Sequence, residues 1–415
     1  MGENSSQSKL WQLWQRTFSS LRYRDYRLIW LGSWAEHIGE MMENMAIAWL
    51  MMKLTGSPYY TGLLIVARTA PLLPFALAGG VVTDRVDRRK LLIFCLLGGA
   101  SVSITLFILA FSGLIAWWHL LVAAGLSGML TGFNHPARGA IVPNVVPRHE
   151  LMNAIALDTI SVRSAALIAA IAGGILISQF GTSVVFGARA IGVVVAIQWL
   201  FMAKVPATPV EASERTPWHN LGEGLKYTGT SALVSVLLGL FALRQFSQEM
   251  PEVFMPFFAA DILQIGAIGF GFLKAALGLG SVVGLFTVAS LGNFRYKGWL
   301  VIITGILMGL FISAFALSTW VLLSLAFLIV ASTLGTVMEN VSRAALQSII
   351  PDQMRGRIMS LREAMRGVFS PVMAYGFGLG GERLGVVVAL SSFGVFIIVC
   401  LSLMAFLIPS LRRLK

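Results

Sequence analysis

Long apolar stretches alternate with short polar connections from about residue 27 to residue 408. Each stretch ends at charged residues or at Pro and Gly clusters, and each approaches the roughly 20 residues that a membrane-spanning helix needs. The pattern predicts twelve transmembrane helices, over residues 27–52, 58–82, 91–113, 117–137, 151–179, 182–203, 232–260, 266–291, 298–316, 319–342, 358–380 and 384–408.

The composition agrees with a membrane protein. Of the 415 residues, 57% are hydrophobic and only 12% are charged, whereas an average soluble domain has about 25% charged residues. This excludes a soluble enzyme, and we expect an all-α membrane protein. The two cysteines lie in apolar stretches, which does not indicate a disulfide framework. We expect no cofactor, because the sequence contains neither a metal-site spacing of His and Cys nor a phosphate-binding G-x-x-x-x-G-K-[ST] loop.

Basic residues gather in every second connection and contribute to the net charge of +12. The opposite connections have almost none, apart from Lys53 and Arg383. The positive-inside rule therefore predicts that both termini and the central connection are cytoplasmic. Contact with anionic membrane lipids accounts for the positive charge, so nucleic-acid binding is not expected. The basic residues on the predicted cytoplasmic side include Arg22, Arg24, Arg27, Arg85, Arg88, Arg89, Lys90, Arg148, Arg215, Lys226, Arg295, Lys297, Arg355, Arg357, Arg412, Arg413 and Lys415.

A long polar connection divides the spans into two sets of six. We predict five parts: a cytoplasmic amphipathic N-terminal segment (1–26), an N-terminal six-helix bundle (27–203), a cytoplasmic linker (204–231), a C-terminal six-helix bundle (232–408) and a cytoplasmic tail (409–415).

The two sets of spans repeat one another in sequence. The matching pairs are Glu40 with Glu249, Glu43 with Glu252, Gly62 with Gly271 and Asp84 with Asn293 at an offset of 209, and residues 145–147 with 349–351 at an offset of 204. A duplicated six-span unit is the expected build of an alternating-access carrier, with two pseudosymmetric bundles and a site between them.

The connection after the second span carries a family motif. Residues 79–90 read GGVVTDRVDRRK, which resembles the G-x-x-x-D-[RK]-x-G-R-[RK] signature of the major facilitator superfamily. Asp87 stands where the signature has Gly, and the matching residues are Gly80, Asp84, Arg85, Arg88 and Arg89. The resemblance covers residues from about 20 to 410 and implies that the spans beginning at 27, 117, 232 and 319 line a central cavity.

The motif predicts a conformational latch. Gly80 would allow two helices to approach closely, and Asp84 would face the positive N-terminus of the helix at 358–380 and pair with nearby arginines while the cytoplasmic side is closed. The alternative is a basic anchor at the membrane surface with an incidental Asp.

The chain most resembles the drug- and siderophore-exporting branch of the superfamily, which includes macrolide efflux and enterobactin exporter-like proteins. Two features of efflux relatives are missing. Residues 123–128 (AAGLSG) contain no Arg, and residues 169–174 (AAIAGG) keep only the second glycine pair of G-P-x-x-G-G. Both departures weaken the expectation of drug/proton antiport.

Three carboxylates on the first span are candidates for proton coupling. Glu36, Glu40 and Glu43 share one helical face, which must look into the protein or a cavity. Burial and neighbouring carboxylates favour the protonated form, so such a cluster can bind and release a proton near neutral pH. Glu40, near the middle of the span, is the first choice. The alternative is that these residues are structural partners of arginines on neighbouring helices.

The seventh span and two buried cations complete the candidate site. Arg244, Gln248, Glu249 and Glu252 lie on the span at 232–260, whose helix Pro251 and Pro256 interrupt. Arg68 and Arg163 lie deep in their own spans and are expected to pair with the carboxylates of the first span, with Glu36 opposite Arg68. The surplus of buried cations favours an anionic or zwitterionic substrate.

These observations predict a secondary active transporter in a bacterial cytoplasmic membrane, working as a monomer. It would export an amphipathic, drug- or siderophore-like small molecule in exchange for protons. Two alternatives stay open. One is an importer or uniporter of an anionic metabolite or lipid that uses Arg68, Arg163 and Arg244. The other is a receptor that does not transport.

Overall fold

A computed structural model describes residues 17–83, 85–205, 222, 225–229, 231–292, 294–412 and 414. Over these residues the chain is helical and forms no β-strand, as the apolar periodicity predicts. The elements of the first half are the turn η1 (Ser19–Arg22), α2 (Arg24–Thr55), α3 (Pro58–Thr69), α4 (Leu72–Thr83), α5 (Arg88–Phe111), α6 (Trp117–Val145), the turn η2 (Arg148–Glu150), α7 (Leu151–Phe180) and α8 (Thr182–Met202).

The second half has the same succession of long helices. Its elements are α10 (Ala232–Phe257), the π-helical turn η3 (Phe258–Ile262), α11 (Gly266–Leu291), α12 (Lys297–Leu317), α13 (Val321–Ile349), α14 (Asp352–Leu384), α15 (Val386–Leu407) and the short α16 (Pro409–Arg412). Because η3 directly continues α10, the seventh predicted span is a single helical segment. The expectation that Pro251 and Pro256 interrupt it is wrong, because both lie inside the continuous helix α10.

Some boundaries differ from the sequence prediction for local reasons. The helix expected over 58–82 is divided into α3 and α4 at Pro71, which has no N–H to donate and disfavours a continuous helix. By contrast, α6 and α13 continue beyond the expected ends at 137 and 342 to Val145 and Ile349. Arg138 and Arg343 follow these expected ends, but arginine is a good helix former and does not end a helix.

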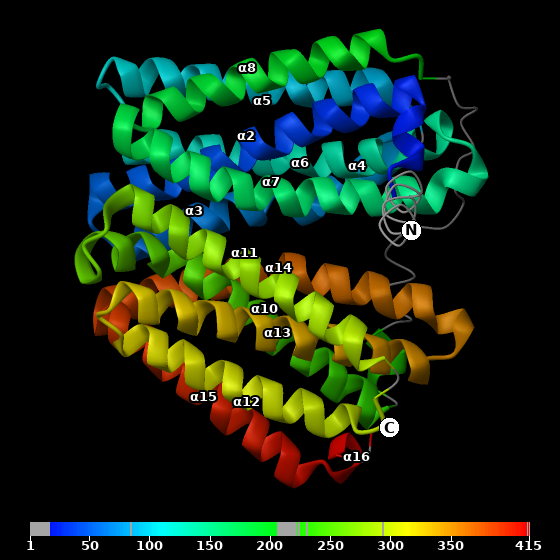
Figure 1. The fold of residues 1–415 in the computed structure, drawn as a ribbon, viewed down its shortest axis with the longest axis vertical. Helices are drawn as coiled ribbons and strands as arrows, with labels where there is room; N and C mark the ends of the chain where they lie inside the picture. The colour runs from blue at the N-terminus through cyan, green and yellow to red at the C-terminus, as the bar shows by residue number, and fades with distance from the viewer. Residues whose placement is uncertain are drawn as a thin grey trace, which may run out of the picture.

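Figure 1 shows the helices of the first half, blue through cyan to green, packed above those of the second half, green through yellow to red. The helices α2 and α10 begin, and α8 and α15 end, at one end of the molecule, on the right of this view. We call this end the terminal side. The opposite end, where α2 ends at Thr55, is called the far side.

Two helix pairs make most of the contact between the halves, α3 with α14 and α7 with α11. Each pair meets at glycines: a Cβ on Gly62 would lie 2.9 Å from Cα of Gly378, and a Cβ on Gly174 would lie 3.2 Å from Cα of Gly271. Gly62 and Gly271 are related by the sequence offset of 209, and Gly174 and Gly378 by 204. The duplicated sequence therefore builds the same close contact twice.

Both glycine contacts lie toward the far side, near the beginnings of α3 and α11 and the ends of α7 and α14. Polar and aromatic contacts between the halves lie there too. Ser57 Oγ donates a hydrogen bond of 2.6 Å to Glu382 Oε2, and the Trp49 ring stacks on Phe270 with centroids 5.8 Å apart. The halves are thus held together on the far side.

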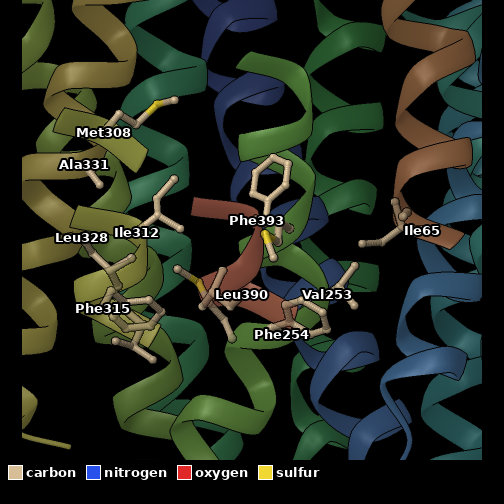
Figure 2. Close-up of a cluster of buried hydrophobic side chains, with 14 of the residues drawn as sticks. Ile65, Val253, Phe254, Met308, Ile312, Phe315, Leu328, Ala331, Leu390 and Phe393 are labelled. Atoms are coloured by element: carbon tan, nitrogen blue, oxygen red, sulfur yellow. The ribbon is translucent and has the colours of Figure 1, made fainter. Parts of the chain in front are cut away.

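The apolar interior of the second half forms one wall of the region between the halves. Figure 2 shows Met308, Ile312 and Phe315 of α12 beside Leu328 and Ala331 of α13. Leu390 and Phe393 of α15 lie next to them. Val253 and Phe254 of α10 lie nearer to Ile65 of α3. These side chains are buried and belong to one cluster that contains residues of both halves, so it packs the helices of the second half together and also joins them to the first half.

Among the described residues, eight helical stretches are long and apolar enough to cross a membrane: 58–80, 88–111, 148–180, 182–202, 266–291, 297–317, 321–349 and 386–407. Four further helices, α2, α6, α10 and α14, have a similar length. Each of these four carries charged side chains that take part in the polar clusters described below. The protein is therefore a multi-pass, all-helical membrane protein.

Candidate functional site

The carboxylates of α2 lie inside the first half, among α5, α6 and α8. Arg138 Nη2 of α6 donates a hydrogen bond of 2.5 Å to Glu36 Oε2, and Arg138 Nη1 lies 2.7 Å from Nε2 of His37. The side chains of Arg138 and Glu36 are 9% and 8% exposed. This buried pair fixes α2 against α6.

A second buried pair joins α2 to α8. Arg189 forms an ion pair with Glu43, and Ser103 Oγ of α5 donates a hydrogen bond of 2.5 Å to the same carboxylate. The arginine passes across Gly39, where a Cβ would lie 3.1 Å from its Cγ, so the glycine makes room for the guanidinium to reach Glu43. Glu43 is therefore held in an ion pair that balances its charge.

Glu40 lies between these pairs and differs from both. Among the described residues it has no ion-pair or hydrogen-bond partner. It lines a small cavity of about 20 Å³ together with Glu36, Ser127 and Arg138. A cavity of this size has room for about one water molecule. Glu40 is thus the carboxylate of this cluster that no described cation holds in an ion pair.

The large cavity lies between the halves and has a volume of about 460 Å³. Its lining comes from α2, α3 and α7 of the first half and from α10, α11, α12 and α13 of the second half. The polar lining residues are Asn44, Arg68, Arg163, Arg244, Ser247, Gln248, Glu249, Glu252, Lys274, Ser281 and Ser332. A volume of this size accommodates a small organic molecule.

The structure separates the predicted site residues into two groups. Arg68, Arg163, Arg244, Gln248, Glu249 and Glu252 line the large cavity, whereas Glu36, Glu40 and Glu43 belong to the cluster in the first half. Arg68 and Arg163 do not pair with the carboxylates of α2 as expected. Arg138 and Arg189 take that place, because they lie on the helix faces that α2 packs against.

Besides the pairing of Arg189, sequence reasoning misses those of Arg138 and Lys274. Arg138 follows the expected end of its span, which suggests a residue outside the membrane, yet its position inside a helix of 29 residues makes it a buried side chain. Lys274 lies within an apolar span, but the pattern does not reveal its ion pair with Glu252. In both cases the signal is an intramembrane charge that requires a partner.

The motif covers the end of α4 and the start of α5, and within it Asp84 lies outside the described residues. Asp87, in place of the usual Gly, caps α5 by accepting hydrogen bonds from the backbone N–H groups of Arg89 and Lys90. The side chain of Arg89 donates to the carbonyl oxygen of Phe201 at 2.7 Å. This hydrogen bond therefore joins the start of α5 to the end of α8.

Two other matching residues of the motif can be placed. Arg88 Nη1 donates to the carbonyl oxygen of Ala140 at 3.1 Å, and Arg85 is exposed after the end of α4. A Cβ on Gly80 would meet none of the described atoms within 4 Å, whereas a Cβ on Gly79 would collide with Gly132 of α6. The close helix approach expected at Gly80 thus occurs at Gly79.

A duplicated helical scaffold with a polar cavity between its halves defines a membrane transporter of the major facilitator type. The family model of transmembrane secretion effectors matches residues 15–414, and the chain belongs to this family. It is accordingly a transporter rather than an enzyme.

Relatives and solved structures agree with this assignment. The chain is 26% identical over 410 residues to the enterobactin exporter EntS of Escherichia coli O1:K1, and equally to that of Shigella boydii serotype 18, covering 97% of each chain. The fold is similar to a bacterial homolog of the human lysosomal transporter Spinster in an inward-facing, occupied conformation, with a TM-score of 0.72, 15% identity and coverage of 95% of this chain and 97% of that one. The POT family transporter PepTSo gives a TM-score of 0.70 at 13% identity, covering 95% of this chain and 99% of that one.

Proposed function

We propose that the protein is a secondary active exporter of an amphipathic small molecule, working by alternating access in a bacterial cytoplasmic membrane. The observation that carries the proposal is the cavity of about 460 Å³ between the two halves, lined by charges from both and lying beside the far-side glycine contacts. The relatives named as enterobactin exporters favour outward transport and a siderophore-like substrate.

The proposed topology has twelve spans, with α3 and α4 forming one of them. The charged helices α2, α6, α10 and α14 cross the membrane inside the bundle, where α2 pairs with α6 and both α10 and α14 pair with Glu339 of α13. The terminal side faces the cytoplasm, as the basic connections require. The structure then corresponds to a carrier closed toward the outside, in which the glycine contacts are made.

The proposed coupling ion is the proton, and its site is Glu40. Glu36 and Glu43 are held by Arg138 and Arg189, so their charges are already balanced. Glu40 has no such partner among the described residues and lies beside a cavity for about one water molecule. Proton and substrate would then bind at separate places in the first half and the central cavity. Asp84 is retained as the proposed latch with Arg85, Arg88 and Arg89.

An importer or uniporter of an anionic metabolite or lipid is the second candidate. Its support is the number of cations on the cavity wall, where Arg68, Arg163, Arg244 and Lys274 face the two carboxylates of Glu249 and Glu252. The direction of transport distinguishes this candidate from the exporter.

Transport in membrane vesicles of both orientations tests the proposal. Everted and right-side-out vesicles would be supplied with labelled amphipathic compounds, including a catecholate siderophore, under an imposed pH gradient with the internal pH recorded. An exporter accumulates its substrate in everted vesicles, releases protons from them and stops when a protonophore is added. Accumulation only in right-side-out vesicles would support the importer, and no protein-dependent flux in either would refute transport of these compounds.

A further inference from the structure

The charges of the central cavity fall into two groups along α10. Toward the far side, Glu252 forms an ion pair with Lys274 of α11, and Arg68 of α3 lies within electrostatic range of both Glu249 and Glu252. Two cations thus face two carboxylates, all four lining the cavity. This end of the cavity is electrically balanced without a ligand.

The other group lies nearer the terminal side and is not balanced. Arg244 Nε of α10 lies 3.6 Å from Glu339 Oε2, but the same carboxylate also accepts a hydrogen bond of 3.0 Å from Arg362 Nη2. One negative charge is therefore shared by two guanidinium groups. Arg163 of α7 lines the same part of the cavity and adds a third cation, with no ion-pair partner among the described residues.

The two arginines that line the cavity here come from opposite halves. Their charges are close enough to repel each other, with Arg163 on the first half and Arg244 on the second. Arg244 is only 6% exposed, and it shares its one carboxylate partner, Glu339, with Arg362. A buried guanidinium whose charge is only partly balanced is costly, and a bound anion would supply the missing negative charge.

We propose that Arg163 and Arg244 form an anion subsite, so that the transported molecule is an amphipathic acid whose charged group lies between these two side chains. Arg guanidinium groups suit carboxylate, phosphate and similar oxyanions, because their N–H groups match paired oxygens. The apolar part of the molecule rests on the wall formed by Met308, Ile312 and Leu328 in Figure 2, which line the same cavity. This inference rests on the proposed transport function.

The subsite also gives substrate a part in the transport cycle. When the halves close around the cavity, Arg163 and Arg244 approach, and their repulsion opposes closure of the empty carrier. A bound anion neutralises the repulsion and permits closure. The balanced group around Arg68 does not impose this requirement.

Equilibrium binding to the purified protein in lipid nanodiscs tests the subsite. The probes are dansylglycine and its neutral amide, which share an apolar body and differ in one carboxylate. The variants are Arg163→Gln, Arg163→Lys and, as a matched removal of one cation from the same cavity, Arg68→Gln. Arg163→Gln is suited to the test because Arg163 is exposed to the cavity and pairs with no carboxylate among the described residues, so its replacement leaves no buried charge.

Wild type is expected to bind the acid at least tenfold more tightly than the amide. Arg163→Gln is expected to weaken acid binding about tenfold, equivalent to about 1.4 kcal/mol, with the amide unchanged. Arg163→Lys should keep most of the acid binding, and Arg68→Gln should lose less than threefold. No preference for the acid in wild type, or equal losses in Arg163→Gln and Arg68→Gln, would overturn the subsite. Because binding is measured without a gradient, failure here is distinct from failure of the export proposal.

Discussion

Replacing Gly62 by Ala should force α3 and α14 apart on the far side. The new Cβ would fall within contact distance of the carbonyl oxygen of Ala374 and 2.9 Å from Cα of Gly378. Both atoms belong to helix backbone, which cannot rotate aside as a side chain does. The two helices must therefore separate by several tenths of an ångström.

The size of the effect follows from the cost of overpacking, which is about 1–3 kcal/mol for an added methyl group in a well-packed place. In the proposed cycle this contact exists only while the far side is closed, so the cost falls on one conformation. A penalty of about 1–3 kcal/mol changes the ratio of the two conformations by about 5–150-fold. Gly271→Ala should act in the same direction, because its Cβ would meet the carbonyl oxygen of Ala170 in the equivalent contact.

Pulsed electron paramagnetic resonance measures this change directly, as the distance between spin labels at positions 53 and 383. Lys53 and Arg383 are exposed on the far side, one in each half. The labels would be attached to cysteines there after Cys95 and Cys400 are replaced by Ala. Gly376→Ala is the control. Gly376 also lies on α14, but a Cβ added there would meet no described atom within 4 Å. A distance distribution for Gly62→Ala that equals that of Gly376→Ala would refute the proposal that the glycine contacts hold the far side closed.

Three further outcomes are expected. Glu36→Gln should lower the thermal stability of the detergent-solubilised protein, by about 3–5 kcal/mol, because it leaves Arg138 buried without its anion; a melting temperature equal to that of Glu40→Gln would contradict the pair. Cysteines placed in the linker 204–231 should react with impermeant maleimide only in everted vesicles, and labelling from outside intact cells would reverse the topology. Asp84→Asn should slow transport without abolishing substrate binding, and full transport activity would show that Asp84 is not a conformational latch.

The glycine contacts illustrate how much the sequence can predict. The offset of 209 relates Gly62 to Gly271 from the sequence alone, and both lie at equivalent contacts between the halves. Periodicity and duplication depend on residues of the same chain segment, so they can be read from sequence. The partner glycines, Gly378 and Gly174, cannot be assigned in this way, because neither pattern tells which helices meet.

The ion pairs also show that sequence patterns do not reveal which helices contact one another. Helical spacing puts Glu36, Glu40 and Glu43 on one face of α2, and all three lie in one buried region of the structure. Their expected partners are on α3 and α7, yet the observed partners come from α6 and α8. The sequence of a helix determines which of its residues share a face, whereas packing of the whole bundle determines which neighbouring helix that face contacts.

Proton-coupled movement of substrate in proteoliposomes is the most direct test of the proposed exporter. The purified wild type and Glu40→Gln would be reconstituted with the substrate that the vesicle experiment selects, and substrate accumulation would be followed after an imposed pH jump. Wild type is expected to accumulate substrate against its gradient, whereas Glu40→Gln should only exchange substrate down its gradient. Equal, pH-driven accumulation by both proteins would contradict Glu40 as the coupling site, and absence of pH dependence in wild type would contradict proton-driven export itself.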